Sequence, residues 1–216
     1  MSTLALSLAP PRSRTTARVT FQVACAVAGS ALIAGLAQVS IHLGFTPVPI
    51  TGQTLGVLLV GAAYGPSLGI LTMLLYLAEG VVGLPVFARN AGGGHDTGLQ
   101  VLGFAATTGG YLWGFVLAGA LTGWLARRGW DRSFRSAIGA MLLGEVVIYA
   151  AGVPWLHHAL PALTGKPVSW QTTFGFGLYP FVIGDTIKLL GAAGLLPGAW
   201  WLMKRAKPGE PADTYA

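Results

Sequence analysis

Long apolar runs separated by short polar or glycine- and proline-rich segments are the main pattern along this chain of 216 residues. Residues 19–43 contain no charged side chain. A helix rises about 1.5 Å per residue, so this run is long enough to cross a hydrocarbon core of about 30 Å. Arginines precede the run, as in a signal peptide, but the run exceeds the usual apolar region of about 7–15 residues. We therefore expect a retained membrane span.

Five further apolar runs follow the first one. Two prolines at alternate positions, Pro47 and Pro49, exclude a regular helix after the first run and favour an extended segment that folds back. The run over residues 55–64 is short for a crossing of about 20 residues, which leaves a choice between five and six spans. The six runs are residues 19–43, 55–64, 68–87, 108–126, 137–155 and 179–203.

The basic residues decide between five and six spans. With six spans and a cytoplasmic N-terminus, ten of the thirteen Lys and Arg lie in cytoplasmic segments. Omitting the short span would place the arginines of 127–135 on the opposite side from those near the N-terminus, against the positive-inside rule. The ten residues are Arg12, Arg14, Arg18, Arg127, Arg128, Arg132, Arg135, Lys204, Arg205 and Lys207.

The pattern thus predicts an all-α, polytopic membrane protein with six transmembrane helices and both termini cytoplasmic. A basic N-terminal segment (1–18) precedes the six-helix domain (19–204), and a cytoplasmic tail (205–216) follows it. The composition agrees, because 53% of the residues are hydrophobic and 9% are charged, whereas soluble domains carry about 25% charged residues. The net charge is +6, and the basic residues form separate groups at the ends of the predicted helices. Anionic lipid headgroups are sufficient partners for such groups. We expect contact with the lipid bilayer and no nucleic acid.

Ionisable residues inside the predicted spans point to function, because each costs about 2.5–3.5 kcal/mol to insert. Asp185 and Lys188 are three residues apart and share one helical face. They form either an ion pair that only reduces the energetic cost of its own burial, or a ligand clamp in which one side chain accepts and the other donates hydrogen bonds. We favour the clamp. Because the last span enters from outside, Asp185 lies about two turns in, so the clamp should open outward. Glu79 and Glu145 are single carboxylates, for which structural and functional roles both stay open.

The three predicted outward loops, 46–54, 89–107 and 157–178, contain few charges. We therefore expect them to fold against the protein. The glycines of 92–94 suit either a plain turn or a close approach of backbone to a ligand. Their neighbour Asn90 both donates and accepts hydrogen bonds and is the better candidate for a ligand contact.

Small residues recur every four positions in the first span. They form the rows Ala24 with Ala28, Ala26 with Ser30 and Ala34, and Ala31 with Gly35. Small side chains let helices approach closely in lipid. These rows indicate either packing within the bundle or a docking face for another membrane protein.

No catalytic apparatus is visible. The four histidines lack metal-ligand spacing, and neither a phosphate-binding loop nor a nucleophile elbow occurs. A membrane-embedded hydrolase would need a metal or a Ser/His pair. We expect no enzyme activity, no metal site and no ATP hydrolysis by this chain.

Four ordered motifs resemble those of the BioY family of biotin transporters. They are Pro47-Val48-Pro49-Ile50-Thr51-Gly52-Gln53-Thr54, Gly83-Leu84-Pro85-Val86-Phe87, Thr108-Gly109-Gly110-Tyr111-Leu112-Trp113-Gly114-Phe115, and Gly184-Asp185 with Lys188. The resemblance implies the substrate-binding subunit of an energy-coupling factor transporter in the bacterial cytoplasmic (inner) membrane. It also implies a transmembrane coupling protein and ATPase subunits as partners, with biotin bound as transported substrate and no cofactor.

The resemblance also implies roles for single residues. Asn90, Asp185 and Lys188 match the polar binding positions, and Thr51 and Gln53 fall in the loop that covers the pocket. The row containing Ala24 and Ala28 matches the docking surface for the coupling protein. The aromatic candidates for the apolar wall of the pocket are Tyr111, Trp113, Tyr149, Phe176 and Tyr179.

The ureido ring of biotin has two N–H donors and a carbonyl acceptor, and its tail ends in a carboxylate. Asp185 could accept from the ring and Lys188 could donate to either end, so the orientation of the ligand stays open. The alternative function is an ion-gradient-driven secondary transporter of another small solute, with Glu79 or Glu145 carrying protons. The sequence also leaves open whether the chain forms a homo-oligomer and whether it transports without the coupling module.

Overall fold

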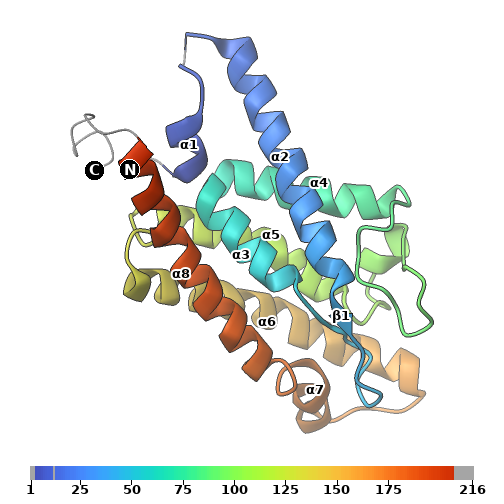
Figure 1. Ribbon diagram of the computed structural model, residues 1–216. Helices are drawn as coiled ribbons and strands as arrows, with labels where there is room; N and C mark the ends of the chain where they lie inside the picture. Colours follow the sequence, from blue (N-terminus) through green and yellow to red (C-terminus); the bar gives the residue numbers. More distant parts are fainter. Residues whose placement is uncertain (1–2, 12, 207–216) are drawn as a thin grey trace.

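The computed structural model of the protein describes residues 3–11 and 13–206 and is mostly helical (Figure 1). Arg12, Lys207 and most of the predicted tail lie outside the described residues. The helices are α1 (Leu4–Leu8), α2 (Thr15–Gln38), α3 (Gln53–Tyr64), α4 (Pro66–Val81), α5 (Gly109–Arg127), α6 (Phe134–Thr164), α7 (Trp170–Gly177) and α8 (Val182–Ala206), with a 3-10 helix at Leu99–Leu102.

Four of these helices, α2, α5, α6 and α8, are long and apolar enough to cross a membrane. Helices α3 and α4 are apolar but have only 12 and 16 residues. Large apolar side chains cover the outside of the bundle, as on α2, where Val19, Val23 and Val27 are all about half exposed. Their spacing of four residues places them on one face, which suits contact with lipid. The all-helical bundle with long apolar helices expected from the sequence is confirmed, while the number of crossings and the side of each terminus stay predictions.

The first predicted span, residues 19–43, extends too far at its C-terminal end. Helix α2 ends at Gln38, and the chain turns into strand β1 (Ser40–Ile41), which pairs antiparallel with β2 (Ile50–Thr51). The extended, folded-back segment expected around the two prolines is therefore confirmed.

The predicted span over 68–87 also ends early, because α4 stops at Val81. Phe87 belongs to the following loop, which folds back so that its ring meets Tyr76 edge-on at 5.3 Å. Gly80 makes room for this fold, since a β-carbon there would overlap the ring of Phe87.

Helix α6 is longer than the predicted span over 137–155. It continues to Thr164 through Pro154 and Pro161, although proline normally breaks a helix. Tertiary contacts hold the extra turns: the indole N–H of Trp155 donates to the carbonyl of Ala106 at 3.0 Å. The ring of His157 stacks on Trp170 of α7 at 3.9 Å. His157 is therefore helical and not part of a loop.

Helix α5 is the centre of the bundle and packs against α3, α4 and α6. These helices lie close together because glycines occupy the contact surfaces. For example, a β-carbon at Gly123 would overlap the backbone of Gly65. Gly65 joins α3 to α4 with a φ of +81°, a conformation that favours glycine. Close packing of small residues is the main way in which helices associate in lipid.

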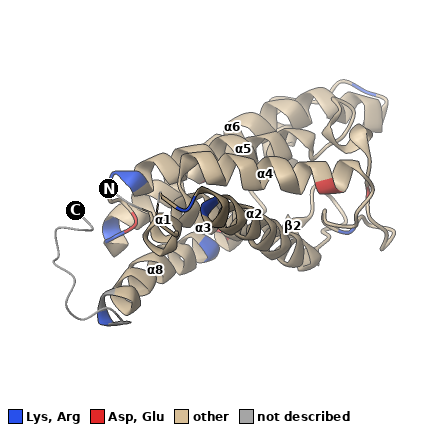
Figure 2. Ribbon diagram, turned by 90° about the horizontal axis from the view of Figure 1, so that it is seen from above, with Lys and Arg blue, Asp and Glu red and all other residues tan. Residues whose placement is uncertain are grey.

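The two ends of the bundle differ in charge. Most Lys and Arg gather at one end of the bundle (Figure 2). We call this the basic end, and it is formed by the start of α2, the Gly65 turn, residues 127–135 and the end of α8. The opposite end, which we call the cavity end, carries the connections 39–52, 82–108 and 165–181. These connections fold onto the protein, as expected: for example, the hydroxyl of Thr46 donates to the carbonyl of Phe176 at 2.7 Å.

Candidate functional site

A cavity of about 310 Å³ lies at the cavity end of the bundle. Residues of the connections 39–52 and 82–108 and of helices α3, α5, α6 and α8 line it. The six ligand-binding residues expected from the sequence all line it. They are Thr51, Gln53, Asn90, Tyr149, Asp185 and Lys188.

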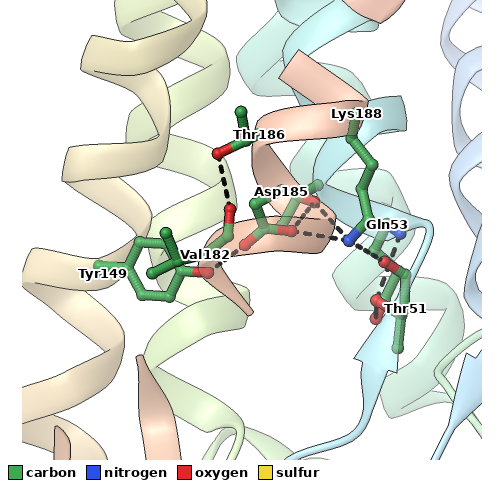
Figure 3. A network of polar contacts seen from close by, with 8 residues as sticks. Thr51, Gln53, Tyr149, Val182, Asp185, Thr186 and Lys188 are labelled. Atoms are coloured by element: carbon green, nitrogen blue, oxygen red, sulfur yellow. Dashed lines mark hydrogen bonds and ion pairs between the residues drawn. The ribbon is translucent and has the colours of Figure 1, made fainter. Parts of the chain in front are cut away.

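Asp185 and Lys188 form an ion pair of 2.7 Å on the wall of the cavity (Figure 3). Asp185 lies in the first turn of α8, where the helix dipole favours a carboxylate. The ammonium of Lys188 also donates to the backbone carbonyl of Thr51 at 2.5 Å, which ties α8 to the segment before α3. Thr186, between them, turns away and donates to the carbonyl of Val182.

Two further helices supply partners for the carboxylate of Asp185. The hydroxyl of Tyr149 on α6 donates to Oδ2. The hydroxyl of Thr54 on α3 donates to Oδ1 at 3.3 Å and accepts from Lys188 at 3.4 Å. Sequence reasoning missed Thr54, although it lies three residues after Thr51 in the same motif. Three helices thus converge on one buried charge pair.

Gln53 belongs to a second, more deeply buried chain of hydrogen bonds. Its amide N–H donates to the hydroxyl of Tyr76 at 2.6 Å, and Tyr76 donates to the carbonyl of Val86 at 3.0 Å. The amide oxygen of Gln53 accepts from Thr51 at 3.0 Å. The chain ties α3 to α4 and to connection 82–108. Tyr76, with Leu77, is part of the family resemblance in the sequence, but sequence reasoning assigned no role to its hydroxyl.

Asn90 organises the glycine turn beside the cavity. Its side-chain oxygen accepts from the backbone N–H groups of Gly92 and Gly94 at 3.1 and 3.0 Å, and its amide donates to Asp96 at 2.9 Å. The neighbouring Arg89 also lines the cavity. Its guanidinium makes no hydrogen bond or ion pair within residues 3–11 and 13–206, so a free cation faces the ligand space.

The aromatic wall differs from the expectation. Tyr111 and Tyr149 line the cavity and meet edge-on at 6.2 Å, whereas Trp113, Phe176 and Tyr179 do not line it. Trp113 is two residues from Tyr111 and therefore points to another side of α5. The phenyl rings of Phe87, Phe115 and Phe181 also line the cavity.

The rows of small residues on α2 differ in burial, so packing within the bundle and an exposed docking face both occur. Ala26 and Ser30 are buried, and Ser30 donates to the carboxylate of Glu79 on α4, so this row packs within the bundle. Ala24 and Ala28 are exposed. Ala31 and Gly35 are exposed as well, so two of the three rows are accessible to another membrane protein.

The site offers complementary groups to a small polar ligand. Asp185 accepts hydrogen bonds, and Lys188 and Tyr149 donate them. In this structure these groups satisfy one another, so a ligand must exchange bonds and not simply add them. Removing one member of a buried pair leaves the other charge uncompensated, which is strongly destabilising.

Comparison with known proteins shows to which family the chain belongs. A sequence model of the BioY family matches residues 10–205. The chain belongs to the BioY family. A biotin transporter BioY of Thermotoga maritima is 38% identical over 76% of this chain and 86% of the relative. One of Rhizobium etli is 34% identical over 71% and 78%, respectively. These relatives are transporters, which agrees with the prediction that the chain is not an enzyme.

A solved structure of the biotin S-component of an ECF-type ABC transporter has the same fold as this BioY chain. The two superpose with a TM-score of 0.69 at 25% sequence identity, covering 88% of this chain and 93% of the other. The BioY membership, the helical bundle and the apolar spans identify a membrane protein of a transporter family.

Proposed function

We propose that this chain binds biotin and serves as the substrate-binding subunit of an energy-coupling factor transporter for biotin uptake. The observation that carries the proposal is the cluster of Asp185, Lys188, Tyr149 and Thr54 on the wall of a cavity of about 310 Å³. Biotin is the cargo in this proposal, and no cofactor is needed.

The charges around the cavity favour one orientation of biotin. Asp185 and Lys188 neutralise each other, so they suit the uncharged ureido ring, whose N–H groups donate to Asp185 and whose carbonyl accepts from Lys188. Arg89, which has no partner among the described residues, suits the carboxylate of the tail. The apolar part of biotin then lies against Tyr111 and Phe115.

We further propose six crossings of the bacterial cytoplasmic membrane with both termini inside. The connections alternate between the two ends of the bundle, and the basic end fits the cytoplasmic side by the positive-inside rule. Helices α3 and α4, about 18 and 24 Å long, fall short of the hydrocarbon thickness of about 30 Å and depend on local thinning or on neighbouring helices. The cavity then opens outward.

The sequence contains no phosphate-binding loop, so ATP-driven transport in this proposal relies on partner subunits. We propose that a transmembrane coupling protein binds the exposed row of α2 that contains Ala24 and Ala28. ATPase subunits would complete the transporter together with this coupling protein. Small residues on this face would let a partner helix approach closely.

Titration calorimetry of the purified protein in detergent tests the function. We expect tight biotin binding at one site, weaker binding of desthiobiotin and none of riboflavin. A folded protein that binds no biotin would overturn the proposal. A secondary transporter for another solute is less well supported, because Glu79 is hydrogen-bonded to Ser30 and the relatives are named biotin transporters.

A further inference from the structure

Glu145 is a buried acid that the proposed biotin site does not use. It lies on α6, about 17 Å from the start of a helix about 46 Å long, so it is about three turns in from the basic end. Its exposed fraction is 5%. Both carboxyl oxygens are buried and have no hydrogen-bond partner among the described residues. A buried polar group normally has a partner, so this one requires an explanation.

The position of Glu145 connects it to the ligand cavity. It precedes Tyr149 by four residues, so both lie on one face of α6, with Glu145 one turn closer to the basic end. Tyr149 donates to Asp185, and α6 packs against α8. Glu145 thus lies behind the wall of the cavity, within electrostatic range of Asp185 and Lys188.

The other helices packed against α6 bring few titratable groups to this depth. Helices α3 and α7 carry no charged side chain, and α5 carries only Arg127, at the basic end. Tyr111 of α5 meets Tyr149 edge-on, and its hydroxyl donates to the carbonyl of Gly177. The charged groups that face Glu145 are therefore Asp185 and Lys188, with the hydroxyl of Tyr149 between α6 and α8.

A charge count shows what this cluster lacks. Lys188 is already satisfied by Asp185, Thr51 and Thr54. With all three groups ionised, Glu145, Asp185 and Lys188 carry a net charge of −1 inside an apolar bundle. One proton on Glu145 makes the cluster neutral, which lowers the cost of burying it.

The ligand changes this balance. Asp185 lines a cavity that is open to solvent when no ligand fills it, and water stabilises a net charge. A ligand that fills the cavity displaces this water, so the net charge becomes more costly and a proton more favourable. We propose that Glu145 is a proton-binding site whose occupation is coupled to that of the ligand cavity. The step adds one proton from solvent to a carboxylate and changes no other bond.

By linkage, the proton and the ligand must strengthen each other's binding to the same extent. This inference rests on the proposed function for the identity of the ligand. It is tested by titrating biotin into the protein in buffers of different ionisation enthalpy, over a range of pH. We expect wild-type protein to take up as much as one proton per biotin, with affinity falling by up to about tenfold per pH unit as pH rises.

The variant Glu145→Gln should bind biotin with no proton uptake and an affinity that does not change with pH. Glu79→Gln is the matched control, because it removes an acid that is bonded to Ser30 and does not line the cavity, and it should behave as wild type. Where Glu145→Gln does not fold, Glu145→Met removes the polar group altogether and carries the same expectation. Equal proton uptake in wild type and Glu145→Gln overturns the inference, as does binding without uptake at every pH.

Infrared spectroscopy separates this inference from the proposed function. A protonated carboxyl in an apolar setting has its own absorption band, which should be present in the wild type and in Glu79→Gln and absent from Glu145→Gln. If biotin does not bind but the band behaves in this way, the proposed function fails and the proton site stands. If the band is unchanged in Glu145→Gln, the proton site is overturned whatever the ligand.

Discussion

The basic end and the cavity end of the bundle use similar hydrogen bonds for different purposes. At the basic end, the carboxylate of Asp131 is 1% exposed and accepts from the indole of Trp200 at 2.6 Å. The guanidinium of Arg132 lies over the same indole at 4.7 Å. These contacts fasten the end of α8 to the connection between α5 and α6.

At the cavity end, the carboxylate of Asp185 also accepts from partners on other helices, but it lines an open space. The comparison teaches that the type of bond does not decide the role. A carboxylate enclosed by protein holds helices together, whereas one that borders a cavity can exchange its partners for a ligand.

The largest expected effect comes from the charge pair at the cavity end. Asp185→Asn and Lys188→Ala should each weaken biotin binding by more than tenfold, because each leaves a buried partner unsatisfied. Thr186→Val is the control, since the Thr186 hydroxyl bonds its own helix backbone. Calorimetry measures the affinities, and wild-type affinity in folded Asp185→Asn and Lys188→Ala would remove these residues from the site.

A somewhat smaller effect is expected at Arg89. Arg89→Gln should weaken the binding of biotin by about tenfold, the low end for a hydrogen bond to a charged group. The same change should leave the binding of biotin amide, which has no carboxylate, nearly unchanged. Competition assays with the two ligands give the ratio, and an equal loss for both would place the carboxylate elsewhere.

At the basic end, Trp200→Phe should lower stability and leave biotin affinity unchanged. Removing the indole N–H leaves the Asp131 carboxylate without that donor, which costs about 1–3 kcal/mol of unfolding free energy. Trp201→Phe is the matched control, because Trp201 is half exposed. Thermal unfolding in detergent measures the difference, and a loss of affinity without a loss of stability would contradict the division between the two ends.

The smallest effect is a pH dependence at Asp131. Burial raises the pKa of the Asp131 carboxyl, although the indole of Trp200 and the charge of Arg132 oppose the rise. A raised pKa means that the folded state binds the proton more tightly, so this contribution to stability is present at low pH and is lost as pH rises.

Asp131→Asn stays neutral and therefore should gain stability relative to wild type as pH increases from about 4 to 7. Melting temperatures of the two proteins across this range give the trend. The opposite trend would show that the hydrogen bond to Trp200 outweighs the cost of burial.

The sequence alone predicted the features that depend on local spacing. The long apolar runs identified the cores of α2, α5, α6 and α8, because a membrane helix must satisfy its backbone within itself and present apolar side chains to lipid. The spacing of three residues between Asp185 and Lys188 predicted their contact for a similar reason, since both lie on one helix.

Only the tertiary structure decided which residues surround that pair. Thr54 and Asp185 are 131 positions apart, and Thr51 and Lys188 are 137 apart, so no periodicity relates them. Packing also decided that α6 continues through Pro154 and that Trp113 does not line the cavity. It likewise decided that Glu79 has a hydrogen-bond partner, whereas Glu145 has none among the described residues. Local sequence sets the face of a helix on which a side chain lies, but the contacts that this side chain makes depend on which helix packs against that face.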